Sequence, residues 1–144
     1  MAFKVFFDTN TILDLFYKER PLHKEALDLF YFLDENYFTA FYSESVLTTA
    51  AYILRKEIAP GKLNEILINL NKKIKLLPCF DFLPEKVLKD KPRDFEDALL
   101  YGIALQSKLD YFISNNLKDF KAFQLTELPV LNSSEFNKIL VSGM

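Results

Sequence analysis

The chain has 144 residues, half of them hydrophobic, with a formal net charge of −2, 3 glycines and a single cysteine. This length and composition predict one domain, residues 1–144, with a full hydrophobic core. The net charge excludes a protein that holds nucleic acid by charge alone, and the single cysteine excludes a disulfide framework within the chain. The scarcity of glycine nearly excludes a glycine-rich phosphate loop.

The first residues, "MAFKVFF", lead directly into a strand and show no signal-peptide pattern. No apolar run approaches the length of a membrane span. With a lone cysteine in addition, we expect a cytoplasmic protein without membrane contact.

Hydrophobic patterns predict strands that alternate with helices along the chain. The first half contains a strand at 4–7, helices at 10–16 and 22–36, a strand at 39–42 and a helix at 43–58 capped by Ser43. The second half contains helices at 60–74, 84–90 and 94–108, strands at 74–77, 110–114 and 128–132, and a serine-capped helix at 133–140. This order implies a parallel sheet with right-handed helical crossovers on both faces.

Polar residues follow two of the predicted strands. Asp8 comes directly after the first strand, and Ser114, Asn115 and Asn116 end the strand "YFIS". In parallel sheets a site forms beyond the carboxyl ends of the strands, near a switch in strand order. We therefore expect these two clusters to contribute to one site.

A third group of polar residues opens the helix at 94–108. In "RDFEDALL", Asp94, Glu96 and Asp97 crowd the first turn of a helix that is apolar nearly all round and so predicted to be buried. If this helix packs beside the first strand, Asp97 approaches Asp8. Carboxylates in one cleft repel one another unless a cation intervenes, and such oxygen ligands suit Mg²⁺ or Mn²⁺, which would activate a water and neutralise phosphate charge.

Other catalytic groups are scarce. The one histidine, His23, begins an amphipathic helix and is predicted to be structural or on the surface. Cys79, between Pro78 and Phe80, is predicted to be a buried apolar residue. No serine lies in a nucleophile-elbow motif, so metal-assisted hydrolysis is the favoured chemistry.

The acidic and polar residues also have structural interpretations. Asp8 or Asn10 can cap the short helix, and Asp94 and Asp97 have the spacing of a capping box. The remaining residues of this kind are the first-turn acid Glu44 and the turn-forming Asn116 and Asp119. The functional interpretation depends on their convergence at one edge of the sheet. A receiver-like phosphoryl-transfer domain fits the alternation too, but a late-strand lysine beside the acids is missing.

Three stretches resemble PIN-domain proteins of the VapC-like toxin family, namely "VFFDTNTILDLF", "VLTTAAYILRK" and "DFEDALLYGIALQSKLDYFISNNLKDF". The last is the most specific, because order, spacing and residue types all agree. The resemblance implies a three-layer α/β/α sandwich with a central, mainly parallel sheet. It also implies a Mg²⁺- or Mn²⁺-dependent endoribonuclease, the toxin of a toxin–antitoxin pair, with an antitoxin partner and a homodimer.

The resemblance assigns roles to individual residues. Asp8, Asp97 and Asn116 fall on the catalytic metal ligands, and Asp119 is a further catalytic residue. The supporting residues are Thr9, which would orient Asp8 or a water, Asn10, which would cap the helix and brace the cluster, and Glu44, Thr49, Asp94, Glu96 and Ser114.

Two positions depart from the family pattern. Many members have a glutamate where this chain has Thr49, and many have a carboxylate where it has Asn116. Both departures imply weaker metal binding, although Glu44 can partly substitute. The alternative is therefore a PIN module with weak or no catalysis that binds RNA or a protein partner.

An RNA substrate would need cations near the acids. Lys91 and Arg93 lie just before the acidic turn and Lys118 follows Asn116, so we expect these three to contact phosphates, with ordinary solvated side chains as the alternative. The same stretch holds Lys86 and Lys89. The additional apolar residues of the helix at 22–36, interpreted as core rather than as a partner surface, are Leu27, Tyr31 and Phe32.

Overall fold

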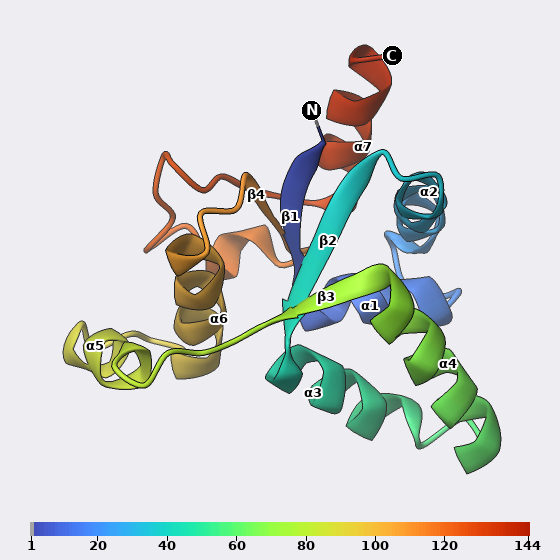
Figure 1. Ribbon diagram of the computed structural model, residues 1–144, viewed down its shortest axis with the longest axis horizontal. Helices are drawn as coiled ribbons and strands as arrows, with labels where there is room; N and C mark the ends of the chain where they lie inside the picture. Colours follow the sequence, from blue (N-terminus) through green and yellow to red (C-terminus); the bar gives the residue numbers. More distant parts are fainter. Residues whose placement is uncertain (1) are drawn as a thin grey trace.

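The computed structural model describes residues 2–144, which form one five-stranded sheet and seven α-helices (Figure 1). The strands are β1 (Phe3–Phe7), β2 (Phe38–Ser43), β3 (Ile74–Leu77), β4 (Tyr111–Ile113) and β5 (Val130–Leu131). Their order is β3-β2-β1-β4-β5, and each pair of neighbours is parallel. The predicted parallel sheet is confirmed.

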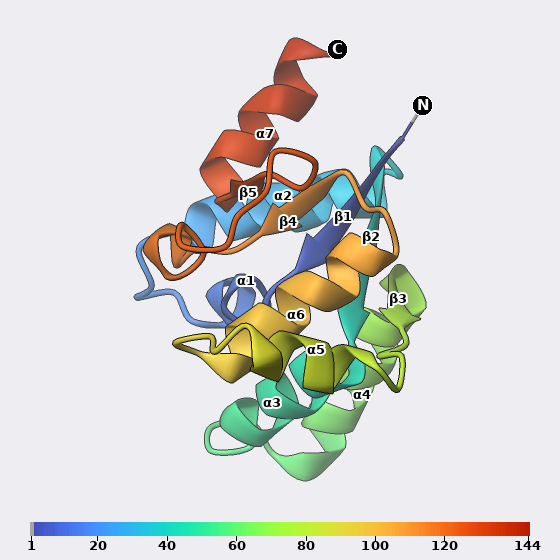
Figure 2. The ribbon, with the colours of Figure 1, turned by 90° about the vertical axis from the view of Figure 1, so that its left-hand side faces the viewer.

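The helices pack in groups on either side of this sheet. They are α1 (Thr9–Phe16), α2 (His23–Asp34), α3 (Glu44–Leu54), α4 (Pro60–Lys73), α5 (Leu83–Lys89), α6 (Phe95–Gln106) and α7 (Ser133–Ser142), with a 3₁₀ helix η1 (Leu117–Asp119). Helix α2 contacts both α1 and α7, while α5 packs on α6 across the sheet (Figures 1 and 2). This is the expected α/β/α arrangement. Within residues 2–144, no helix combines the length and the apolar character needed to cross a membrane.

The central strand β1 is buried on both faces. Val5, Phe6 and Phe7 are fully buried, as the continuous apolar run predicts for an inner parallel strand. The ring of Phe6 stacks on Phe112 of β4 with centroids 4.9 Å apart, and Phe7 packs on Phe30 of α2 at 5.4 Å. The end of β1 is thus held firmly on both sides.

The strand order changes direction between β1 and β4. The chain passes from β1 outward to β2 and β3, then returns through α5 and α6 to β4 on the other side of β1. Phe7 pairs with Ile113, so Asp8 and Ser114 leave the sheet side by side. This switch point is where a parallel sheet opens a site.

The helix caps agree with the prediction in part. Of the two residues considered for α1, Asp8 is the cap and Asn10 is not, because Asp8 Oδ1 accepts the Thr9 N–H at 2.7 Å. Asn132, not a serine, caps α7 in a complete capping box with Glu135, with bonds of 2.8 and 2.9 Å. The predicted cap at Ser43 is confirmed.

Three side chains predicted to be buried are exposed. Cys79 lies in the segment after β3 and is exposed. Leu27 and Tyr31 of α2 are 47% and 59% exposed. Their prediction as core was wrong because α2 turns only its other face to the core, through Ala26, Leu29, Phe30 and Leu33.

The segment that follows η1 is tied to α6 by Tyr101. This hydroxyl donates to the Leu128 carbonyl at 2.7 Å and accepts the Leu125 N–H at 2.8 Å. Tyr101 lies one helical turn after Asp97. The contact therefore links the helix that carries Asp97 to the segment just beyond Asp119.

We predict that Tyr101→Phe lowers the free energy of unfolding by about 1–2 kcal/mol, because two backbone groups lose their partner in a partly buried place. Urea unfolding followed by circular dichroism measures it. Tyr31→Phe, on an exposed tyrosine, is the matched control and should change stability by less than about 0.5 kcal/mol. Equal effects in the two variants would contradict the role of Tyr101.

Candidate functional site

Asp8 is a buried carboxylate at the carboxyl end of β1, only 5% exposed. Its Oδ1 accepts the Thr9 N–H, and its Oδ2 accepts the hydroxyl of the fully buried Ser114 at 2.8 Å. Burial raises the pKa of Asp8 to about 6; the charges of Glu96 and Asp119 add to the rise, while the two hydrogen bonds partly offset it. Asp8 therefore caps α1 and also faces the acids of other elements.

Asp97 lies in the first turn of α6 and is partly buried. The preceding Asp94 caps α6 by accepting the Asp97 N–H at 3.0 Å. The pKa of Asp97 is raised to about 7. Burial is the largest cause, and the negative charges of Asp8, Asp94, Asp119 and Glu96 raise it further. Asp8 is the first of these charges, so Asp97 lies within electrostatic reach of Asp8.

The two residues after β4 are placed differently from each other. Asn116 is exposed, and its backbone N–H donates to Ser114 Oγ at 3.2 Å. Asp119, in η1, is exposed as well, but its charge acts on both Asp8 and Asp97. Asp119 is therefore the residue of this turn that belongs electrostatically to the acid cluster.

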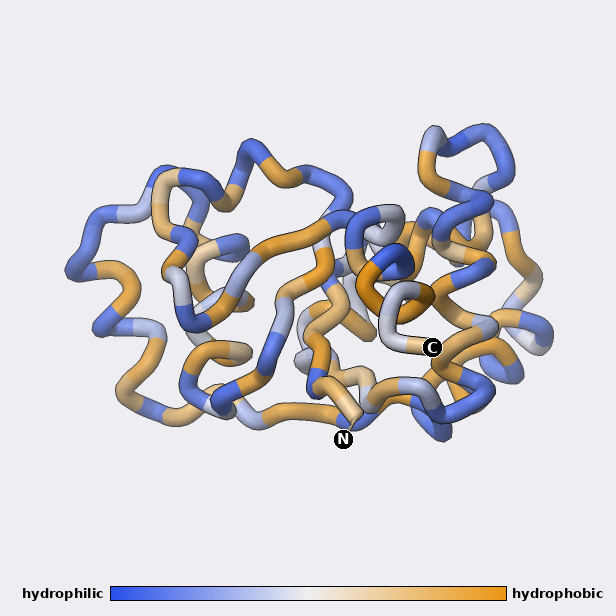
Figure 3. The backbone as a smooth tube through the Cα atoms, turned by 90° about the horizontal axis from the view of Figure 1, so that it is seen from above, coloured by the Kyte–Doolittle hydropathy of each residue, from blue (hydrophilic) through white to orange (hydrophobic). Residues whose placement is uncertain are grey.

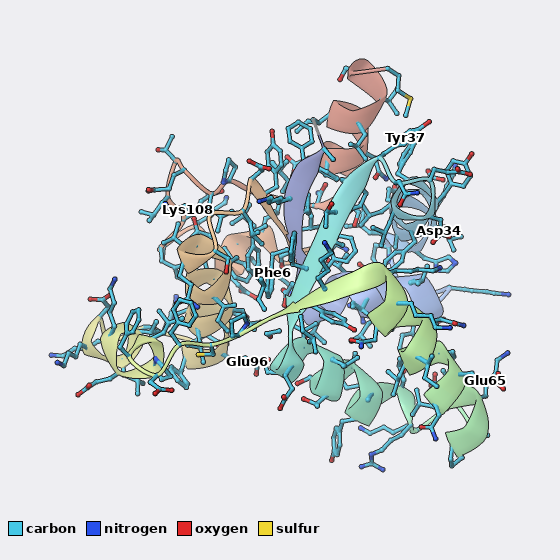
Figure 4. All side chains as sticks on the ribbon, in the orientation of Figure 1. Phe6, Asp34, Tyr37, Glu65, Glu96 and Lys108 are labelled. Carbon is cyan, nitrogen blue, oxygen red and sulfur yellow. The ribbon has the colours of Figure 1, made fainter. Side chains whose placement is uncertain are left out.

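The other predicted supporting residues lie on α6 and α3. Glu96 is exposed at the lower end of α6 in Figure 4 and acts on the pKa of both Asp8 and Asp97. Glu44, exposed, and Thr49, partly buried, lie on α3, which starts at the carboxyl end of β2. Glu44 is not among the main charges that act on the two central acids.

The cluster is open rather than a closed cage. Among residues 2–144, no three His, Cys, Asp or Glu side chains come close enough together to share a metal ion. Thr9 Oγ1 is buried next to Asp8, and no group in the described chain bonds it. Oxygen donors that repel one another and a buried hydroxyl without a partner fit a hydrated divalent cation, since Mg²⁺ uses only one or two carboxylates and keeps several waters.

A second polar cluster, which the sequence did not reveal, joins α1 to the turn after β4. Asp14 of α1 is only 2% exposed, and its carboxylate accepts hydrogen bonds from Arg20 and from Asn115. Asn115 in turn accepts the Ser133 N–H of α7 at 3.1 Å. Asn115 thus ties the turn after Ser114 to both α1 and α7. The available signal was an acid within the apolar run "ILDLF".

Two residues near this cluster are structural. Asn10 accepts a hydrogen bond from Arg20 at 3.3 Å, so it braces the cluster without capping α1. His23 Nδ1 lies 2.7 Å from the Asp14 carbonyl oxygen, which confirms its predicted structural role.

The three predicted RNA contacts are exposed and flank the acid-bearing turns. Lys91 and Arg93 lie between α5 and Asp94, with Lys91 in the left-handed region at φ 51°. Lys118 is next to Asp119 in η1. All three are therefore close in sequence to an acid of the cluster, and their contact with RNA stays a prediction.

Known proteins resemble the chain in sequence and in structure. Residues 4–118 match the family model of the PIN domain. Ribonuclease VapC1 of Aquifex aeolicus (strain VF5) is 30% identical over 140 residues, which cover 92% of each chain.

Solved structures share the fold at low sequence identity. VapC20 of Mycobacterium tuberculosis, a sarcin-ricin loop cleaving toxin, has a TM-score of 0.66 at 15% identity and covers 84% of this chain and 96% of its own. VapBC2 of Rickettsia felis, bound to a promoter DNA fragment, has a TM-score of 0.65 at 17% identity. The match covers 90% of this chain and 98% of the Rickettsia chain. A toxin–antitoxin complex from Klebsiella pneumoniae has a TM-score of 0.64 at 20% identity and covers 86% and 94%.

The family match spans both strand ends and the opening of α6, so it contains Asp8, Asp97 and Ser114. Together with a relative that aligns over nearly all of the chain, it shows that this protein belongs to the PIN-domain family.

Proposed function

We propose that the chain is a divalent-cation-dependent endoribonuclease and the toxin of a toxin–antitoxin pair. The observation that carries this is the pair Asp8 and Asp97, whose pKa values are raised to about 6 and about 7 by burial and by neighbouring acids. Near neutral pH such a pair is stabilised by a cation, which offsets the repulsion. Similarity to a protein named as a ribonuclease supports RNA as the substrate.

The cation would be Mg²⁺ or Mn²⁺, held by Asp8 and Asp97 with help from Asp119 and Asn116. When bound, it would activate a water and neutralise charge on the phosphate. Ser114 and the Thr9 N–H keep both oxygens of Asp8 in fixed directions. The Asp94 cap fixes the first turn of α6 and with it Asp97.

The second candidate is a PIN module that binds RNA or protein with weak or no catalysis. Thr49 and Asn116, neutral where many family members have acids, favour it. The two candidates differ in metal binding, because a non-catalytic module has no use for a specific cation. Calorimetric titration with Mn²⁺ distinguishes them.

We also propose an antitoxin partner. Two of the solved structures with this fold belong to a VapBC pair and to a toxin–antitoxin complex. A homodimer and a cytoplasmic location remain predictions from the sequence.

We predict that wild-type protein cleaves a mixed RNA panel with Mn²⁺ and not with EDTA, and that Asp97→Asn lowers the rate by at least about 100-fold. The variant keeps the size of the side chain and removes the charge that would hold the cation. Asp28→Asn, an exposed acid on α2, is the matched control and should cleave like wild type. Undiminished cleavage by Asp97→Asn would overturn the site assignment, and no cleavage with no Mn²⁺ uptake by wild type would favour the binding module.

We further predict that the charge on Asp97 makes stability depend on pH. A carboxyl whose pKa is raised on folding binds more protons in the folded chain between about pH 4 and about pH 7, so stability falls as pH rises through that window. In EDTA, Asp97→Asn should leave the melting temperature unchanged at pH 4 and raise it by about 3 °C at pH 8, after allowance for solvent screening.

Millimolar Mn²⁺ at pH 8 should reverse this order, because only wild type gains a bound cation. Asp28→Asn again serves as control in the same thermal scans. If Asp97→Asn changed the melting temperature equally at pH 4 and at pH 8, the pKa of Asp97 would not be raised by folding.

A further inference from the structure

Exposed apolar side chains gather in the segment between β3 and α6. Phe80, Phe82 and Leu88 are 47%, 58% and 52% exposed, and the rings of Phe80 and Phe82 lie 6.0 Å apart. We call residues 80–93 the α5 arm. It lies on the outer side of α6, away from the sheet (Figures 1 and 2), and orange and blue segments alternate along it at the left of Figure 3.

The inner face of the arm is fixed on α6. Leu83 is buried, and it lies so close to Gly102 that an added Cβ there would come within 3.3 Å of Leu83 Cδ1. Val87, one turn later, faces the same glycine. The arm is therefore a packed element whose outer side chains are presented in a fixed direction.

Helical spacing places an aromatic residue and two cations on that outer face. Phe82, Lys86 and Lys89 are four and three residues apart and all exposed, about a third of a turn around the helix from Leu83 and Val87. Two further cations, Lys91 and Arg93, continue the series up to Asp94. The seven residues of α5, which rise about 10 Å, separate the two phenylalanines from the segment that leads to the acidic turn.

The charges of the arm favour an anionic partner. It carries four cations and three acids in a chain whose net charge is −2. Among the described residues, only Lys89 of these four lies within 4 Å of an acid, at 3.9 Å from Glu85. In a symmetric contact between two copies, the same patch would meet itself, so its net charge of +1 would face an equal charge. A polyanion avoids that repulsion.

We propose that the α5 arm binds the single-stranded RNA beside the phosphate to be cleaved. Phe80 and Phe82 stack on unpaired bases, and Lys86, Lys89 and Lys91 contact phosphates as the strand runs toward Asp97. In a duplex the bases stack on one another and present no free face, so the arm selects unpaired RNA. This inference rests on the proposed nuclease function and adds the substrate's unpaired state and its path.

The test measures binding by fluorescence anisotropy with a fluorescein-labelled single-stranded RNA and a duplex of the same length, in EDTA to prevent cleavage. We expect tighter binding of the single strand by wild type. Phe80→Ala/Phe82→Ala should weaken it by about tenfold. Lys86→Ala/Lys89→Ala should also weaken binding of the single strand. In this variant the slope of log affinity against log salt concentration should become shallower by about 1 to 2.

The controls are matched in chemistry and lie on other helices. Leu27→Ala/Tyr31→Ala removes two exposed apolar side chains from α2, and Lys62→Ala/Lys72→Ala removes two exposed lysines from α4. Both should bind the single strand like wild type. All four variants should have melting temperatures near that of wild type. If the phenylalanine variant fails to fold, the salt dependence of RNA binding by the lysine variant tests the proposal instead.

Several results would overturn the proposal. These are single-strand binding by Phe80→Ala/Phe82→Ala equal to wild type, a wild-type preference for the duplex, or a loss of affinity shared by the controls. Sedimentation of the same samples tests a subunit interface, because a lower mass for the phenylalanine variant would assign the arm to contact between copies.

Mn²⁺-dependent cleavage by the same proteins separates this inference from the proposed function. If wild type cleaves, Asp97→Asn does not, and the arm variants bind and cleave normally, the nuclease stands and the arm proposal fails. If Asp97→Asn cleaves like wild type while the arm variants lose affinity, RNA binding by the α5 arm is supported and the assignment of the nuclease site to Asp97 is wrong.

Discussion

The hydrogen bond from Ser114 to Asp8 is the contact on which the site depends. It joins the ends of β1 and β4, which are neighbours only because the strand order reverses there. An apolar strand buried on both faces delivers a carboxylate into a place with little water, and burial is the largest cause of its raised pKa. The fold that builds the core therefore also creates a carboxylate that is stabilised by a partner of opposite charge.

Helix capping and the acid cluster use the same residues. Asp8 caps α1 and Asp94 caps α6, and Asp97 lies in the first turn of α6, where the helix dipole favours acids. The structural and functional interpretations of these acids were alternatives in the sequence, but they are compatible in the structure. Two helix starts converge on one sheet edge, where the charge of Asp8 raises the pKa of Asp97 and the charge of Glu96, also in the first turn of α6, raises the pKa of Asp8.

The sequence predicted what depends on local pattern and on strand ends. Alternating strands and helices follow from periodicity, and Asp8 and Asp97 follow from their places at a strand end and a helix start. The contact between Asp14 and Asn115 joins residues 101 positions apart, so no local pattern reveals it. The exposure of Cys79 and Tyr31 depends on which face the tertiary packing leaves uncovered, and hydrophobicity alone does not decide this.

The turn after β4 shows how a family pattern and the geometry of one chain differ. The family resemblance selects Asn116, yet the residue of this turn whose charge acts on Asp8 and Asp97 is Asp119, three residues later. The acidic charge near this strand end therefore comes from the turn that follows Asn116. Tyr101 holds the segment just beyond Asp119 against the helix of Asp97. In the proposed function Asp8 and Asp97 would hold the cation, which would neutralise charge on an RNA phosphate, and the α5 arm would hold the RNA beside them.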